Sequence, residues 1–215
     1  MDGTLIDSNP THQEAYTQFF KRYGINLTDE DFKEQISGRM NPDIMKHFFG
    51  DDLSDERIEE LTNEKEQLYQ QLFAPKIKPV AGLLDILNRA HDARIPMALA
   101  TSAPMMNVQF MYDHIPVESF FSQIVTDKDV AVGKPDPTVF RIAAERLGAD
   151  PQRCVVFEDS PAGVEAGRRA GMKVVALTTS HTPDELGQAN LVVSNYTEIS
   201  VEQVRRLVEQ TADIA

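Results

Sequence analysis

The chain has 215 residues, with 34 Asp and Glu against 21 Lys and Arg, so its formal net charge at pH 7 is -13. Hydrophobic residues at 41% and charged residues at 26% are typical of a globular protein long enough to bury a substantial core. The acidic charge, without a compensating basic run, argues against nucleic acid as a partner.

No apolar stretch approaches the roughly 20 residues that a membrane helix needs, and the start carries no charged-then-apolar leader. We therefore expect a cytoplasmic protein without a membrane partner. Separately, we expect a monomer or weak dimer. The single cysteine, Cys154, lies in the apolar run Cys154-Val155-Val156-Phe157. It is expected to be a buried strand residue rather than a reactive thiol, because a nucleophilic cysteine needs an electropositive, partly exposed setting.

The first eight residues read as a loop at the carboxyl end of a strand, because Asp2-Gly3-Thr4 places an acidic residue before a small turn. The pattern then becomes helical, with Phe19, Phe20 and Tyr23 at three- and four-residue spacing. Thr28-x-x-Asp31 approximates a capping box. The expected helices are Thr11–Tyr23, Thr28–Ile36, Pro42–Phe49 and Asp55–Phe73. We predict that residues 10–78 form a helical domain inserted into an α/β domain of residues 1–9 and 79–215.

From Pro79 onward, apolar strands alternate with helices. Pro137 is expected at the first helical position of its helix, and Gly148 just past its end. The expected strands are 96–100, 123–126, 153–157, 173–177 and 191–193, and the expected helices are 83–93, 107–113, 137–147, 162–170 and 201–209. This alternation predicts an α/β fold with a Rossmann-like, doubly wound parallel sheet covered by helices on both faces.

Three later apolar runs end in polar residues of catalytic type. Thr101 and Ser102 follow Ala98–Ala100, and a hydroxyl with backbone N–H groups at a strand end can hold phosphate oxygens. Lys134 follows Val132-Gly133 and precedes Pro135, which keeps it off a helix as a point charge. The alternative to a phosphate-binding role is that Thr101 and Ser102 simply cap a helix and that Lys134 lies in a solvated loop. The stretch is not a nucleotide-binding P-loop, because Pro135 stands where that motif needs Ser or Thr.

Glu158-Asp159 follows the apolar run 155–157, so both carboxylates emerge at the end of a predicted strand. Adjacent acids repel one another unless a cation lies between them, and a set of hard oxygen ligands suits Mg²⁺ rather than zinc. A solvated acidic turn is the alternative for any such pair. The context Glu-Asp-Ser-x-x-Gly after a buried strand favours a metal site.

The four loops, in this order and over essentially the whole chain, resemble those of the haloacid-dehalogenase-like (HAD) phosphohydrolases, most closely the β-phosphoglucomutase-like subfamily. The first motif of that family is Asp-x-Asp-Gly-Thr/Val, in which the first Asp is the nucleophile. Met1 occupies the x position, so the nucleophile and the strand that carries it would precede Met1. We expect that the printed sequence begins late; the alternative, a genuine start at Met1, predicts a poorly stable and inactive chain.

The resemblance also implies roles for residues of the α/β domain. Asp2 matches the general acid/base, and its backbone carbonyl would coordinate the metal. Asp159 matches the direct metal ligand and Glu158 a ligand that often acts through water, so that Asp2, Glu158 and Asp159 form the expected Mg²⁺ site. Thr101 and Lys134 match the other catalytic residues, and Ser102 is a candidate for substrate binding.

The resemblance identifies the helical segment as a mobile cap. In it, His12 matches a hinge histidine. Lys65 and Tyr69 resemble a lysine and a tyrosine of that cap that bind substrate. Gly38-Arg39 resembles the substrate-recognition loop. The relatives place an arginine that binds phosphate three residues after the glycine, where this chain has Asn41. Arg39 is thus at best a displaced substitute, and surface roles compete for His12, Arg39 and Lys65.

The leading interpretation is a Mg²⁺-dependent phosphatase of a small phosphorylated metabolite, namely a sugar phosphate, acting through an aspartyl-phosphate intermediate. One alternative is a β-phosphoglucomutase, which returns the phosphoryl group to the sugar. Another is a non-catalytic module that binds phosphate. A two-component receiver domain uses similar residues, but it is much shorter and lacks a helical insert.

Overall fold

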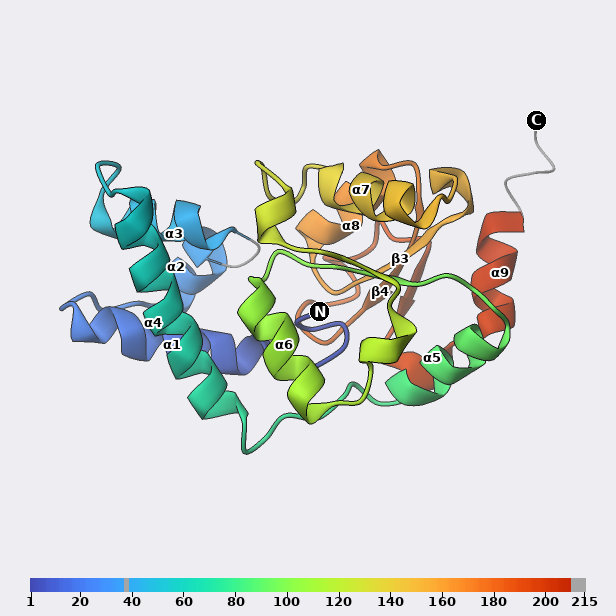
Figure 1. Cartoon of the computed structure of the whole chain (residues 1–215), viewed down its shortest axis with the longest axis horizontal. Helices are drawn as coiled ribbons and strands as arrows, with labels where there is room; N and C mark the ends of the chain where they lie inside the picture. The colour runs from blue at the N-terminus through green and yellow to red at the C-terminus, as the bar shows by residue number, and fades with distance from the viewer. Residues whose placement is uncertain (37–38, 210–215) are drawn as a thin grey trace. The chain divides into compact units, whose positions relative to one another are not determined.

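A computed structural model describes residues 1–36 and 39–209. The chain divides into two compact units (Figure 1), one made of Met1–Asp7 with the chain from Lys78 onward, and one made of Ser8–Ile77. We call them the core unit and the helical unit and describe each by itself. Their roles as a catalytic domain and a cap stay predictions at this point.

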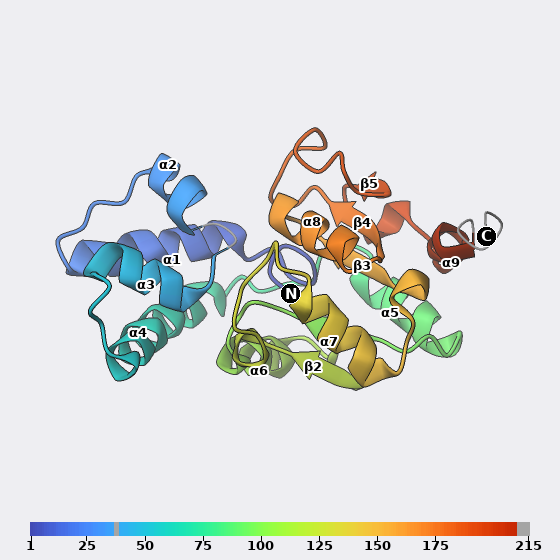
Figure 2. The same ribbon diagram turned by 90° about the horizontal axis from the view of Figure 1, so that it is seen from above.

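The helical unit contains α1 (Asn9–Arg22), α2 (Asp29–Asp31), a π-helical turn (Phe32–Ile36), α3 (Asn41–Phe49) and α4 (Asp55–Phe73). Figure 2 shows these helices around α1 and α4, which pack against each other. The Thr28 side chain accepts from the Asp31 amide and the Asp31 carboxylate accepts from the Thr28 amide, which confirms the capping box. The predicted helix over 28–36 is wrong in one respect, because it changes to π-helical geometry at Phe32.

The described residues of the core unit form five short strands, and every paired strand runs parallel to its neighbour, as predicted. β1 (Ala98–Ala100) pairs with β2 (Gln123–Val125). β3 (Val155–Glu158), β4 (Lys173–Leu177) and β5 (Leu191–Val193) pair in that order. Among the described residues, no strand pairs with both β1 and β3, so the sheet is in two parts.

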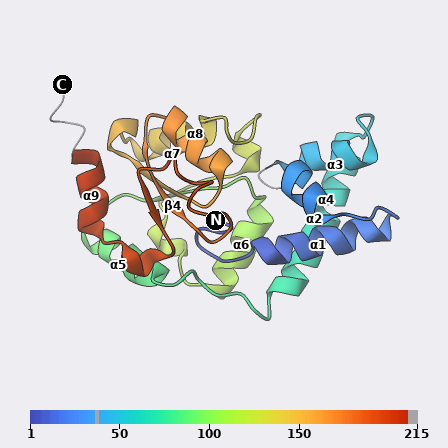
Figure 3. The ribbon, with the colours of Figure 1, turned by 180° about the vertical axis from the view of Figure 1, so that it is seen from behind.

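Helices cover both sides of these strands. α7 (Thr138–Leu147) contacts β1 and β2, and α8 (Pro161–Arg169) contacts β3 and β4. On the other side α9 (Val201–Glu209) contacts β3, and α5 (Leu83–Asp92) contacts α9. The view from behind in Figure 3 shows α5 and α9 together, apart from α7 and α8. The doubly covered α/β fold is therefore confirmed; α6 (Met105–His114) completes the helices of the described core unit.

One hydrophobic core cluster lies between α7, α8 and the strands. Its buried members are mostly Val and Ala, which let helices approach the sheet closely: Val125, Val139, Phe140, Ala143, Ala144, Val156, Val164, Ala166, Ala170, Met172, Val174, Ala176 and Leu186. Ala98 and Ala100 pack against this cluster. No helix of the described residues is both long enough and apolar enough to cross a membrane.

Two local predictions need correction. Pro137 is the N-cap of α7 rather than its first helical residue, whereas Gly148 adopts the predicted left-handed conformation after the helix, with a φ of 63°. Cys154 is only partly buried and lies outside β3, at the end of a 3₁₀ turn (Pro151–Arg153). The Cys154 thiol donates to the Asp150 carbonyl oxygen at 3.3 Å, which draws this residue into the turn that precedes the strand.

Candidate functional site

The opening residues form a tight loop held by its own backbone and by later parts of the core unit. The Leu5 amide donates to the Met1 carbonyl at 2.7 Å, and Gly3 has a φ of 64°, a left-handed conformation that glycine adopts readily. The Val80 amide donates to the Leu5 carbonyl at 2.9 Å, and the Tyr196 hydroxyl donates to the Thr4 carbonyl at 3.1 Å. Asp2 is therefore carried on a fixed loop.

Lys134 and Glu158 form a buried ion pair between the loop after β2 and the end of β3. The Glu158 carboxylate also accepts from the Asp159 amide and from the Ser160 hydroxyl, each at 3.1 Å. Burial raises the pKa of Glu158, but the Lys134 ammonium, the Met1 amino group and the hydrogen bond from the Asp159 amide outweigh it and lower the pKa overall. Glu158 is thus held as a carboxylate that points back toward its own loop.

Asp159 is buried, and both of its carboxylate oxygens accept hydrogen bonds. The Ser180 hydroxyl donates to Oδ2 at 2.5 Å, and the Thr4 hydroxyl approaches Oδ1 at 3.3 Å. Burial and the neighbouring Glu158 carboxylate raise the pKa of Asp159 to about 6. The adjacent carboxylates of Glu158 and Asp159 therefore repel each other, and water does little to screen that repulsion because both are buried.

The charges of the predicted groups of the core unit act on the nitrogen of Met1. The amino group there is buried, and the charged groups that act on it are Asp2, Lys134, Glu158 and Asp159. Burial lowers the pKa of this amino group and Lys134 lowers it further, while the three carboxylates oppose the shift. The charges of Asp2, Lys134, Glu158 and Asp159, from three separate segments of the sequence, thus act on the opening loop.

Thr101 and Ser102 follow β1, as predicted. The Thr101 amide donates to the Val125 carbonyl at 2.9 Å, which extends the pairing of β1 with β2 by one residue. The buried Thr101 hydroxyl accepts from the Ala103 amide at 3.1 Å, whereas Ser102 is partly exposed. Both residues follow the carboxyl end of the β1–β2 pair, as Glu158 stands at the carboxyl end of β3 in the other part of the sheet.

The described core unit has oxygen atoms of the type that binds a metal ion, but they are not arranged around one point. Among the described residues, no group of three His, Cys, Asp or Glu side chains is arranged to hold a metal ion. The oxygens of Glu158 accept from Lys134 and Ser160. The chemistry of the donors nevertheless fits a hard cation, because Asp2, Glu158 and Asp159 offer only oxygen, and a cation would relieve the repulsion that raises the pKa of Asp159.

The remaining predicted residues lie in the helical unit. His12 stacks on Tyr69, with ring centroids 3.7 Å apart. The buried Lys65 ammonium lies 2.6 Å from Glu66 Oε1 and 4.1 Å from the centroid of the Tyr16 ring. Exposed Arg39 donates to the Glu34 carbonyl at 3.2 Å. Gly38 is outside the described residues.

Asn41 takes part in the same buried network of the helical unit. Its Nδ2 donates to Glu66 Oε1 at 2.9 Å, and its Oδ1 accepts from the Tyr16 hydroxyl at 2.6 Å. Asn41, Tyr16 and Glu66 are all buried. The sequence pattern singled out Lys65 but gave no sign of Glu66, because a single acidic residue in an acidic helix has no distinguishing context.

The loop after β4 is a further part of the site that the sequence analysis missed. The Thr179 hydroxyl donates to the Gly3 carbonyl, and His181 Nδ1 lies 3.0 Å from the Asp159 carbonyl oxygen. Thr178-Thr179-Ser180 directly follows an apolar strand. The rule that found Thr101, Lys134 and Glu158 could therefore have found this loop as well.

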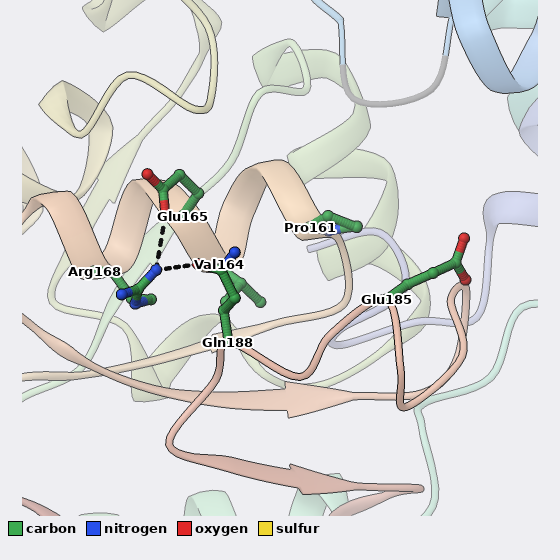
Figure 4. A pocket seen from close by; sticks show the side chains of 6 residues that line it. All are labelled: Pro161, Val164, Glu165, Arg168, Glu185 and Gln188. Atoms are coloured by element: carbon green, nitrogen blue, oxygen red, sulfur yellow. Dashed lines mark hydrogen bonds and ion pairs between the residues drawn. The ribbon is translucent and has the colours of Figure 1, made fainter.

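A surface pocket of about 190 Å³ lies beside α8 and the loop 181–188, and none of the predicted site residues lines it (Figure 4). Arg168 bridges the pocket wall by contacts with Glu165 and Gln188. The residues that line the pocket are Pro161, Val164, Glu165, Arg168, Glu185 and Gln188.

Comparisons with known proteins agree with this architecture. The chain is 33% identical over 180 residues to a phosphorylated carbohydrates phosphatase of Thermotoga maritima, covering 80% of each chain. It is 30% identical over 203 residues to hexitol phosphatase A of Escherichia coli, covering 94% of this chain and 91% of the relative.

Solved structures of the same fold cover nearly the whole chain. A HAD hydrolase of Entamoeba histolytica superposes with a TM-score of 0.87 at 30% identity, covering 97% of this chain and 96% of that one. A β-phosphoglucomutase of Clostridium difficile shares the fold, with a TM-score of 0.84 at 23% identity over 99% and 96% of the two chains. The model of the haloacid dehalogenase-like hydrolase family matches residues 1–177. The chain therefore belongs to the haloacid dehalogenase-like hydrolase family.

Proposed function

We propose that the chain is a Mg²⁺-dependent phosphatase that hydrolyses a sugar monophosphate. One observation carries the proposal, namely that the loops with Asp2, Lys134, Glu158 and Asp159 are in direct contact, because Lys134 pairs with Glu158 and Thr4 of the opening loop contacts Asp159 at 3.3 Å. Phosphoryl transfer needs positive charge on the phosphate oxygens and a proton donor for the leaving oxygen, and these groups offer both. The named phosphatases of carbohydrates and hexitols among the relatives support a phosphorylated polyol or sugar as the substrate.

We infer that the nucleophile is an aspartate directly before Met1, on a strand between β1 and β3. Two observations support it: the opening loop contacts Asp159 through the Thr4 hydroxyl, and the described strands β1 and β3 share no common partner. A carboxylate oxygen of that aspartate attacks phosphorus and the bond to the sugar oxygen breaks. Asp2 protonates the leaving alkoxide and then accepts a proton from the water that attacks the aspartyl phosphate, which releases phosphate and restores the carboxylate.

The other residues position and neutralise the phosphate. Lys134 supplies a fixed positive charge, and Thr101 and Ser102 supply a hydroxyl and backbone N–H groups at the end of β1. Asp2 and Asp159 would hold Mg²⁺, with Glu158 acting through water, and the bound ion would neutralise charge on the phosphoryl oxygens.

We further infer that the helical unit is the cap that selects the substrate. Asn41 stands where the phosphoglucomutase-like relatives carry an arginine that binds phosphate, and it is engaged by Tyr16 and Glu66. A cap without that arginine suits a substrate with one phosphate. This difference favours a phosphatase over a mutase, which must hold a bisphosphate.

The test is Mg²⁺-dependent release of phosphate from a panel of sugar and polyol monophosphates. The chain of 215 residues is compared with a chain extended at its start by a short apolar strand that ends in Asp. Release only by the extended chain supports the proposed nucleophile, and equal release by both chains contradicts it. Formation of glucose 6-phosphate from β-glucose 1-phosphate would instead indicate a mutase. Phosphate binding without turnover by the extended chain would indicate a binding module.

A further inference from the structure

The loop that follows β4, residues 178–182, lies beside the loop that follows β3. The two strands are parallel neighbours, and Glu158 is paired with Ala176. Their carboxyl ends therefore open at the same edge, which brings residues 179–181 next to Asp159. None of these loop residues belongs to the motifs that point to phosphoryl transfer.

Three consecutive side chains of this loop contact the site. The Ser180 hydroxyl donates to Asp159 Oδ2 at 2.5 Å, a distance typical of a strong hydrogen bond to a charged oxygen. His181 Nδ1 lies 3.0 Å from the Asp159 carbonyl oxygen. The Thr179 hydroxyl donates to the Gly3 carbonyl in the opening loop. The loop thus ties together the two segments that carry Asp2 and Asp159.

The contact with Ser180 matters most, because it fixes the orientation of a carboxylate. Rotation about the last bond of an aspartate side chain is broad, so burial alone does not select one orientation. Ser180 binds one oxygen of Asp159 and Thr4 approaches the other at 3.3 Å, so the carboxylate plane is held from two sides. Partners of this kind commonly set the affinity of a metal ligand.

We propose that Ser180 is a positioning residue that holds the Asp159 carboxylate ready for the divalent cation. The inference rests on the proposed metal-dependent function, and it adds that the cation affinity depends on a hydroxyl from the loop after β4. Removing this hydroxyl should weaken Mg²⁺ and Mn²⁺ binding by about 10- to 100-fold. Because the defect lies in positioning a ligand, excess metal should restore most of kcat.

The test measures cation binding directly by isothermal titration calorimetry with Mg²⁺ and with Mn²⁺, in the 215-residue chain and in the extended chain. The variants are Ser180→Ala, Ser180→Cys, which keeps the size with a weak donor, and Ser180→Thr, which keeps the hydroxyl. The proposal is supported by three results together. The Ala and Cys variants bind the cations weakly, the Thr variant binds them nearly as tightly as the parent, and the melting temperature measured in the absence of metal is unchanged.

A matched control is Ser194→Ala, because Ser194 also donates to a carboxylate, Glu198 Oε1 at 2.8 Å, but on the surface after β5. The Ser194→Ala variant should bind Mg²⁺ and Mn²⁺ with the same affinity as the parent. If the parent binds Mg²⁺ and the Ser180→Ala and Ser180→Cys variants bind it equally tightly, the role of Ser180 is overturned while the proposed metal-dependent function stands. A parent that binds neither cation in either chain would overturn the proposed metal-dependent function and this inference with it.

Discussion

Gly163 lies against the carboxylate of Glu158, so closely that a Cβ atom at position 163 would be 2.0 Å from Glu158 Cδ and 2.1 Å from Oε2. Gly163 also donates its amide to the Ser160 hydroxyl at 3.1 Å, which starts helix α8. The first turn of α8 therefore forms a wall of the site, and only a residue without a side chain fits there.

Gly163→Ala should consequently displace Glu158 and its ion pair with Lys134. We expect a loss of stability of about 1–3 kcal/mol from overpacking, together with a large loss of phosphatase activity. Urea unfolding and phosphate release measure the two effects.

The control for Gly163→Ala is Gly171→Ala, at the other end of α8. Gly171 has a φ of 82° and nothing within 4 Å of a built Cβ, so this change should cost about 1–2 kcal/mol through backbone strain alone. Its activity should remain near that of the parent. A Gly163→Ala protein that is fully active would show that Glu158 need not keep its observed position.

Lys134→Ala should be both inactive and unstable, because it leaves the buried Glu158 carboxylate without its cation. Removing one partner of a buried ion pair typically costs about 3–5 kcal/mol. Denaturant unfolding measures the cost, with Arg89→Ala as the control. Arg89 pairs with Asp85 at 2.8 Å on the surface, where ion pairs contribute little. Equal stability losses in the two variants would contradict a special role for the Lys134–Glu158 pair.

The predicted strand ends located most of the site. Periodicity and apolar runs identify the strands, and the polar residues after them, Thr101, Lys134 and Glu158, are then expected at the carboxyl ends of parallel strands. The same argument applies to Ser180, although it belongs to no motif of the family. What no pattern shows is the partner of each carboxylate, because Lys134 and Glu158 are 24 residues apart and their contact depends on tertiary packing.

The helical unit shows the limit of periodicity more clearly. The apolar spacing of α4 gives its bounds, Asp55–Phe73, without error. Spacing says nothing of the contact between Asn41 and Glu66, which are 25 residues apart, or of the change to π-helical geometry at Phe32. These features follow from how polar groups satisfy one another after the helices have packed.

Cys154 should react slowly with thiol reagents in the folded protein. Burial and the nearby Asp150 carboxylate raise the pKa of its thiol, so the thiolate is scarce at neutral pH. We expect alkylation by iodoacetamide to be several-fold slower than that of free cysteine and to accelerate in urea, as followed by mass spectrometry. Folded protein that reacts as fast as free cysteine would contradict this assignment.

Asn41→Ala should destabilise the helical unit, because Tyr16 and Glu66 each lose a buried hydrogen bond to Asn41. We expect a cost of about 1–3 kcal/mol. Gln13→Ala, which removes an exposed bond to Asp29 in the same unit, should change stability little. In a double-mutant cycle, Tyr16→Phe should cost less in the Asn41→Ala background than in the parent. Strict additivity would show that the two residues do not act together.

Asp129 should stabilise the loop before Lys134 in a way that depends on pH. Its carboxylate accepts from the Thr126 amide at 2.8 Å and pairs with Arg146, and these contacts lower its pKa in the folded protein. A carboxyl group whose pKa falls on folding stabilises the protein above the pKa of the unfolded chain, about 3.9, and loses that effect as the pH falls through the lower folded value. Asp129→Asn should therefore lower the melting temperature at about pH 7 and converge with the parent toward about pH 2. Because Arg146 also donates to the Ile124 carbonyl at 2.6 Å, the arginine should stay in place in the variant, and a melting difference that persists unchanged at low pH would rule out the ionised carboxylate as its cause.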